Sequence, residues 1–213
     1  MTNNYNHIAG FYDILSHTVY GKAIVNAQKD LIQYIKPGSS ILIAGGGTGW
    51  ILEELTKMYS EGLQIEYVEI SEKMIGLSKK KNTGHNKVNF VCQPIEEYIP
   101  DKKFDYIFTA FFFDNFKKEK ISVLFAKLNA VLQYNGYWLY ADFMYKKTQG
   151  KLWQKLLLKI MYIFFRVTCK IETTTLTDMQ PFFHKYGYTP VFSSTHYAGF
   201  IYAGVYEKTV WIA

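Results

Sequence analysis

A cluster of glycines and a later glutamate have the spacing needed to hold a ribose-bearing ligand. The glycines follow the apolar run Ile41–Ala44, and Glu69 comes 20 residues after the last of them. Glycine allows the backbone to turn sharply and to approach a ligand closely, and a carboxylate at the end of the next strand can accept hydrogen bonds from ribose hydroxyl groups. The glycines are Gly45, Gly46, Gly47 and Gly49.

The spacing of these glycines argues against a dinucleotide. The dinucleotide fingerprint requires glycine at its first, third and sixth positions, and the sixth position here is Trp50. A smaller ligand without a pyrophosphate remains compatible, as does a glycine-rich turn that binds nothing.

Asp114 is the candidate for proton transfer. It follows the predicted strand Phe104–Ala110 within a run of phenylalanines. Ligands of open α/β sheets bind beyond the carboxyl ends of the strands, so Asp114 is expected at an active site. The alternative is that Asp114 caps the amphipathic helix predicted over 117–132.

The elements that position these residues alternate between strands and helices. The other predicted strands cover 64–70, 88–92 and 137–142, and a terminal hairpin covers 191–197 and 200–207. This order is typical of an α/β fold with a mainly parallel sheet and an antiparallel edge.

The ordered series of motifs resembles class I S-adenosylmethionine-dependent methyltransferases. The resemblance rests on the G-x-G-x-G spacing, on Glu69 followed by Ile70 and Met74, and on the pair Phe104-Asp105 that opens the fourth strand. It implies a Rossmann-like seven-stranded sheet of order 3-2-1-4-5-7-6, with strand 7 antiparallel and helices on both faces. It also implies S-adenosylmethionine as the methyl donor.

The resemblance assigns further residues to the cofactor. Glu69 would bind the ribose, and Ile70 and Met74 would pack against the adenine. Gln93 would accept from the adenine amino group, where many relatives have an acid. The remaining implied cofactor residues are Pro94, Ile95, Thr109 and Ala110.

The pair Tyr12-Asp13 resembles the N-terminal segment of small-molecule methyltransferases related to ubiquinone and menaquinone C-methyltransferases. In those relatives the segment caps the cofactor pocket, and the tyrosine can face the methyl donor. Tyr12 therefore joins Asp114 as a candidate catalytic residue, with a packed surface helix as the alternative. One departure is Ile43, which stands where many relatives have an acid, so a contact to the cofactor's amino group is either absent or supplied by another residue.

The size and composition suit one methyltransferase domain. The chain has 213 residues, of which 49% are hydrophobic and 20% charged. We expect an N-terminal helical cap at 1–38, a cofactor-binding core at 39–142, a lid-like helical insertion at 143–175, and the last helix with the hairpin at 176–213. Two distant cysteines and five dispersed histidines indicate neither a disulfide framework nor a metal site, and the apparent lack of a signal peptide predicts a cytoplasmic protein.

The net charge of +6 invites a nucleic-acid interpretation, which the residue types weaken. Of the 24 basic residues only Arg166 is an arginine, and arginine is the residue suited to bidentate phosphate and guanine contacts. We therefore expect a small, apolar or aromatic acceptor and no nucleic acid.

The stretch 150–168 combines a broad apolar stripe with basic residues. It is expected to be a lid over the acceptor or, alternatively, an amphipathic helix that makes peripheral contact with a membrane surface. The competing function is a non-catalytic module that docks on a membrane or a protein through this helix. The sequence does not indicate the oligomeric state.

Overall fold

Seven strands form one sheet in the order β3-β2-β1-β4-β5-β7-β6, as predicted. The computed structural model describes residues 6, 9–10, 12–145, 151–171 and 173–209, without the side chains of residues 12–14. β7 is antiparallel to both β5 and β6, and the other neighbouring strands are parallel. The strands are β1 (Ser40–Ala44), β2 (Glu61–Glu69), β3 (His85–Cys92), β4 (Phe104–Ala110), β5 (Leu132–Phe143), β6 (Tyr188–His196) and β7 (Ile201–Lys208).

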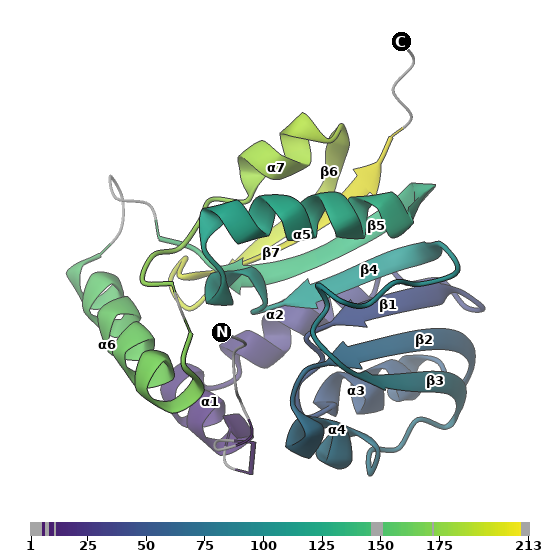
Figure 1. Cartoon of the computed structure of the whole chain (residues 1–213), viewed down its shortest axis with the longest axis horizontal. Helices are drawn as coiled ribbons and strands as arrows, with labels where there is room; N and C mark the ends of the chain where they lie inside the picture. The colour runs from purple at the N-terminus through teal and green to yellow at the C-terminus, as the bar shows by residue number, and fades with distance from the viewer. Residues whose placement is uncertain (1–5, 7–8, 11, 146–150, 172, 210–213) are drawn as a thin grey trace.

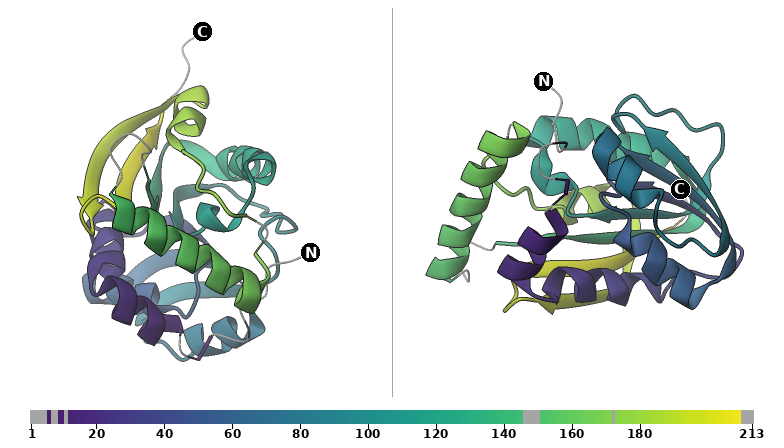
Figure 2. Two further views of the ribbon diagram at one scale, coloured as in Figure 1. Left: turned by 90° about the vertical axis from the view of Figure 1, so that its left-hand side faces the viewer. Right: turned by 90° about the horizontal axis from the view of Figure 1, so that it is seen from below.

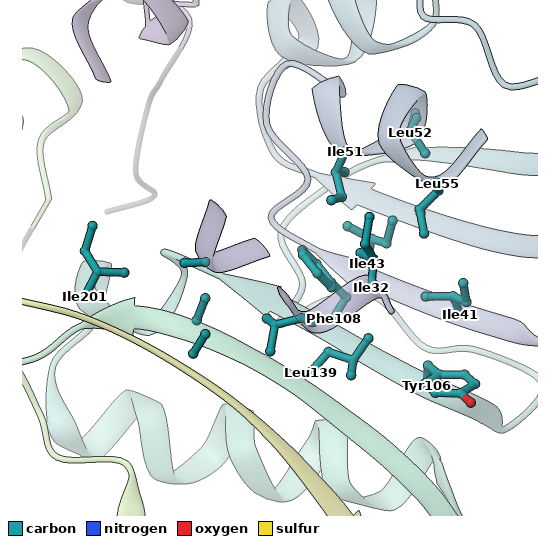
Figure 3. Packing of buried hydrophobic residues seen from close by; sticks show 14 of the residues in the cluster. Ile32, Ile41, Ile43, Ile51, Leu52, Leu55, Tyr106, Phe108, Leu139 and Ile201 are labelled. Atoms are coloured by element: carbon teal, nitrogen blue, oxygen red, sulfur yellow. The ribbon is translucent and has the colours of Figure 1, made fainter. Parts of the chain in front are cut away.

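Helices cover both faces of the sheet (Figure 1). The helices are α1 (Tyr12–Tyr20), α2 (Ala23–Ile32), α3 (Trp50–Met58), α4 (Glu72–Ser78), the short 3-10 helix η1 (Phe113–Asn115), α5 (Lys118–Val131), α6 (Leu152–Cys169) and α7 (Gln180–Lys185). Alternate residues of β1 enter different cores because successive side chains of a strand point to opposite faces. Ile41 and Ile43 pack with α2 and α3 (Figure 3), whereas Leu42 and Ala44 pack on the side of α5 and α7.

This packing explains the residue at position 43. Ile43 is 1% exposed and lies among Ile32 of α2 and Leu52 of α3. Its side chain belongs to the core between the sheet and these helices, so it offers no polar group to a ligand.

Two helices stand apart from the layers that cover the sheet. α1 and α6 lie beyond the carboxyl ends of the parallel strands, and the two views of Figure 2 place them next to each other. This is the edge at which an open α/β sheet binds its ligand.

Two local predictions were wrong. The strand after the helix at 117–132 was predicted over 137–142, but β5 already begins at Leu132, and Asn135 has a φ of 61° inside an irregular stretch of the pairing with β4. The alternative role of Asp114 as a cap also fails, because Lys117 is the N-cap residue of α5.

Candidate functional site

A cavity of about 760 Å³ opens at the carboxyl ends of β1, β2 and β4. It lies where the strand order reverses on either side of β1, the usual ligand site of such a sheet. One wall contains the glycine turn and Glu69, and the opposite wall contains α1, the start of α2 and the inner side of α6. Its volume lies within the range of cofactor and ligand pockets.

The glycine turn is held down on the second strand. The N–H of Gly45 donates to the carbonyl of Val68 at 2.9 Å, and the hydroxyl of Tyr67 donates to the carbonyl of Gly47 at 3.0 Å. A Cβ added at Gly46 would lie 2.1 Å from the ring of Tyr67. Glycine is required there because the backbone of the turn rests directly on this buried ring.

Gly47 needs glycine for a different reason. Its φ is 66°, a region that residues with a Cβ rarely adopt, and no atom lies within 4 Å of a Cβ added to it. Gly47 lines the cavity, so the missing side chain leaves open space for a ligand. Gly45 and Gly46 also line the cavity, whereas Gly49 does not; it is the N-cap residue of α3 and packs against Ser78 of α4.

Glu69 ends β2 with its carboxylate fixed by the backbone. One oxygen accepts from the N–H of Gly47 at 3.0 Å, and the other accepts from the N–H of Ser71 at 2.9 Å. Burial raises the pKa of Glu69, and these backbone hydrogen bonds oppose the rise because they favour the charged form. Each oxygen keeps a second lone pair, so a diol in the cavity can donate two hydrogen bonds to a carboxylate that is already oriented.

The structure brings most of the predicted cofactor residues to the lining of the same cavity. Ile70, Met74, Gln93, Ile95 and Ala110 line it. Ser71 is the N-cap residue of α4, and its hydroxyl accepts from the N–H of Met74 at 3.2 Å.

Two of the predicted residues do not line the cavity. Pro94 lies outside the lining. Thr109 is fully buried, and its hydroxyl accepts a hydrogen bond from the indole N–H of Trp138 at 2.9 Å. Its side chain therefore points into the sheet–helix core, as the period-2 alternation of a strand requires for the neighbour of Ala110.

Asp114 lines the cavity and is supported by a second buried carboxylate. Asp142, at the end of β5, is 2% exposed and accepts from the N–H groups of Phe113, Asp114 and Phe143 at 3.2, 3.3 and 2.8 Å. Burial raises the pKa of both carboxyl groups, and the charge of Asp114 raises that of Asp142 further. Asp142 thus positions η1 and, through it, Asp114; sequence reasoning placed Asp142 on the strand but missed this role.

A tyrosine other than the predicted one faces Asp114. Tyr20 lines the cavity, is 8% exposed, and donates to the sulfur of Met161 in α6 at 3.4 Å. Burial raises its pKa, with a further contribution from the charge of Asp114. Tyr12 begins α1, and its side chain lies outside the described part of the structure.

The residue after β4 has a strained backbone at the middle of the cavity. Phe111 has a φ of 51°, which is uncommon for an aromatic residue, and its N–H donates to the carbonyl of Ala141 at 2.8 Å. Its ring packs against Phe143 with a centroid distance of 5.0 Å, and both residues line the cavity. Such strain is found mainly where surrounding structure holds a functional geometry.

The Asp114–Asp142 pair makes stability depend on pH. A raised pKa means that the folded state holds the proton more tightly than the unfolded state, so the free energy of unfolding should fall as pH rises from the ordinary carboxyl range to the raised pKa. The slope is at most about 1.4 kcal/mol per pH unit for one proton. In Asp114→Asn, the free energy of unfolding measured in urea should change less with pH than in the wild type. Asp101→Asn, at an exposed position, should keep the pH dependence of the wild type. Parallel curves for the two variants and the wild type would contradict the assignment.

The strand order and the position of the cavity are those of the Rossmann-like methyltransferase fold. Residues 41–136 match the sequence model of a family described as a methyltransferase domain, which is less than half of the chain. The malonyl-[acyl-carrier protein] O-methyltransferase 2 of Ilyobacter polytropus is 33% identical over 104 residues, which are 49% of this chain and 39% of that protein. The chain therefore spans well under two thirds of this relative.

Solved structures share the fold across nearly the whole chain. The 1,6-didemethyltoxoflavin-N1-methyltransferase of Burkholderia thailandensis, bound to S-adenosylhomocysteine, is 16% identical with a TM-score of 0.64, and the match covers 95% of this chain and 85% of that one. The magnesium protoporphyrin IX methyltransferase of Synechocystis, also with S-adenosylhomocysteine, is 18% identical with a TM-score of 0.62, covering 88% and 85%. At these identities the likeness shows the fold.

Two further observations concern only the described residues. No three histidine, cysteine, aspartate or glutamate side chains among them converge as metal ligands would. None of the helices in this part of the chain has the length and apolar character needed to cross a bilayer.

Proposed function

We propose that this protein transfers the methyl group of S-adenosylmethionine to a small, neutral, apolar or aromatic acceptor. The observation that carries the proposal is one cavity with two chemically different ends. Its lining includes the glycine turn with the oriented carboxylate of Glu69, which we assign as the cofactor end, and Asp114 among aromatic and aliphatic side chains, which we assign as the acceptor end. The bound cofactor would supply an electrophilic methyl group on a sulfonium.

The residues at the first end fit that cofactor. Glu69 would accept from the ribose hydroxyl groups, and Ile70, Met74 and Ile95 would pack around the adenine. The open space at Gly47 leaves room for the amino-acid tail to pass the turn. Gln93 lines the same region and would accept from the adenine amino group through its side-chain carbonyl.

The second end selects against charged acceptors. Among the described lining residues Lys120 is the only lysine or arginine, and it forms an ion pair with Glu96 near the proposed adenine site. The walls around Asp114 come from Phe111, Phe143 and the inner side of α6. A carboxylate or phosphate bound there would meet no lysine or arginine side chain, and the carboxylate of Asp114 would repel it.

Asp114 is the proposed general base for an acceptor with an acidic hydroxyl, nitrogen or carbon. Its raised pKa makes it a stronger base than an ordinary carboxylate once it is ionised. Tyr20 would remain a neutral phenol and could donate a hydrogen bond to the acceptor. Phe111 and the α6 wall would exclude water and hold the acceptor in line with the methyl group, which supplies much of the acceleration in such a reaction.

Three finer assignments are part of the proposal. α1 and α2 line the cavity through residues such as Val19 and Ile24, which supports the resemblance to the ubiquinone and menaquinone C-methyltransferase group. The inner side of α6 acts as a lid. The two unpaired cysteines, Cys92 and Cys169, suit a reducing compartment, and we place the protein in the cytoplasm.

The test is release of S-adenosylhomocysteine with a panel of hydroxylated aromatic, amine and carboxylate acceptors. Neutral aromatic acceptors should be methylated and free carboxylates should not.

Asp114→Asn should lower kcat by roughly 100-fold and leave the Kd for S-adenosylmethionine within about twofold. Because the base must be ionised, wild-type kcat should rise with pH through the raised pKa of Asp114. Preferential turnover of carboxylates, or full activity of Asp114→Asn, would overturn these assignments.

The competing function is a non-catalytic module with a vestigial pocket. It predicts a folded protein that binds neither S-adenosylmethionine nor S-adenosylhomocysteine. The fixed carboxylate of Glu69 and the open space at Gly47 favour the enzyme, because a vestigial site has no need for either.

A further inference from the structure

The outer side of α6 carries an unusual concentration of exposed apolar side chains. Eleven large hydrophobic residues of the described chain are exposed, and six of them lie on this one helix. They are Leu152, Trp153, Leu156, Ile160, Ile163 and Val167, with exposed fractions between 40% and 86%. The remaining five are scattered over other elements, as single exposed apolar residues commonly are.

Five of these residues form a row. Leu152, Leu156, Ile160, Ile163 and Val167 recur three or four positions apart, so they lie along one side of the helix. The opposite side of α6 is packed: Gln154, Met161, Tyr162 and Cys169 are buried. Tyr162 donates to the backbone carbonyl of Asp114 at 3.4 Å, so the helix is fixed to η1 with the apolar row facing outward.

A row of positive charge runs beside the apolar row. Lys151, Lys155, Lys159, Arg166 and Lys170 are all exposed, and residues 151–171 contain no aspartate or glutamate. None of the five forms an ion pair with another described residue. The same helix therefore presents apolar side chains and uncompensated positive charge to the outside.

This combination selects the occupant of the surface. An amphipathic helix with apolar and basic outward residues lies in the interface of an anionic bilayer, with the apolar side chains among the acyl chains and the basic ones among the headgroups. α6 is an 18-residue helix, and it lacks the length and apolar character of a membrane span. A symmetric contact between two copies would instead bring like charges together.

We infer that the outer side of α6 docks the protein on the surface of an anionic lipid bilayer. The docked helix lies flat on the membrane and leaves the sheet on the aqueous side, because α6 stands at the edge of the molecule (Figures 1 and 2). Ile160 is 54% exposed and also lines the cavity. The docked surface thus adjoins the wall of the cavity. The inference does not depend on methyl transfer.

The experiment is co-sedimentation of the full chain with phosphatidylcholine vesicles that contain or lack phosphatidylglycerol, without cofactor or acceptor. The wild type should bind the anionic vesicles and lose affinity as salt is added. The double variant Lys155→Glu with Lys159→Glu should weaken binding by roughly 25-fold or more. Loss of each lysine accounts for about fivefold, and the two added negative charges weaken binding further. Leu156→Gln with Ile163→Gln should weaken it by roughly 100-fold. The emission of Trp153 should shift to the blue on binding, and Trp153→Phe should remove that shift.

Matched controls separate docking from folding and from the cavity. Val123→Gln on α5, where Val123 is 68% exposed, and Lys87→Glu on β3 should bind vesicles like the wild type. None of the α6 residues changed in the two double variants lines the cavity, so cofactor affinity should be unaffected in them. If the protein proves not to transfer methyl groups, vesicle binding is still expected. If it proves not to bind vesicles, methyl transfer is still expected.

Three results would overturn the inference. The first is no binding of the wild type to anionic vesicles, and the second is equal binding by the α6 variants and the controls. The third is a dimer in light scattering that Leu156→Gln with Ile163→Gln converts to a monomer.

Discussion

Glu69→Gln is expected to abolish measurable binding of S-adenosylmethionine. Each ribose hydroxyl loses a hydrogen bond to a charged acceptor, worth about 1.5–3 kcal/mol, so affinity should fall by at least about 100-fold. Glutamine is not a conservative replacement here, because both oxygens of Glu69 accept from backbone N–H groups. An amide has one oxygen, and its NH₂ group would face one of these N–H donors without an acceptor.

Calorimetric titration with S-adenosylmethionine and S-adenosylhomocysteine is the measurement. Glu66→Gln is the matched control, because Glu66 lies on the same strand but outside the cavity, where it accepts from the side chain of Asn89 at 2.6 Å. The control should bind both ligands like the wild type. Wild-type affinity in Glu69→Gln, with its circular dichroism spectrum unchanged, would show that Glu69 does not hold the ribose.

Gly46→Ala is expected to disrupt both stability and cofactor binding. The new Cβ would lie 2.1 Å from the ring of Tyr67, a fully buried residue whose hydroxyl also holds the carbonyl of Gly47. The overlap between the new Cβ and the ring can be removed only if the ring or the turn moves. Overpacking of this kind typically lowers the free energy of unfolding by about 1–3 kcal/mol. A shift of the turn would also displace the N–H of Gly47 from Glu69, so the affinity for S-adenosylmethionine should fall by more than about tenfold.

Urea unfolding and calorimetry on the same samples give the two readouts. Gly76→Ala is the control: Gly76 lies within α4, and no atom is within 4 Å of the added Cβ. Alanine is the better helix former, so this control should be stabilised by about 0.5–1 kcal/mol and should bind normally. Gly46→Ala with wild-type stability and affinity would mean that the turn has room to adjust.

The sequence by itself determined the sheet and placed the glycine turn and Glu69 at neighbouring strand ends. Buried strands read as continuous apolar runs, and turn residues mark their ends, so local patterns were enough to place β1 and β4. The resemblance to methyltransferases then supplied the strand order. Glu69 was identifiable as a candidate for the same reason: the prediction follows from its position at a strand end, which is a local property of the chain.

Tertiary structure decided the acceptor end. Asp142 supports η1 through the backbone N–H groups of Phe113 and Asp114, which lie 29 and 28 positions away, and no local pattern records such contacts. Tyr20 lines the cavity close enough to feel the charge of Asp114, and Tyr162 donates to the backbone carbonyl of Asp114, because α1 and α6 fold back over the strand ends. Ile43 carries no polar role because its side chain faces the core. These facts depend on which segments meet in space, whereas strand patterns depend only on neighbours in sequence.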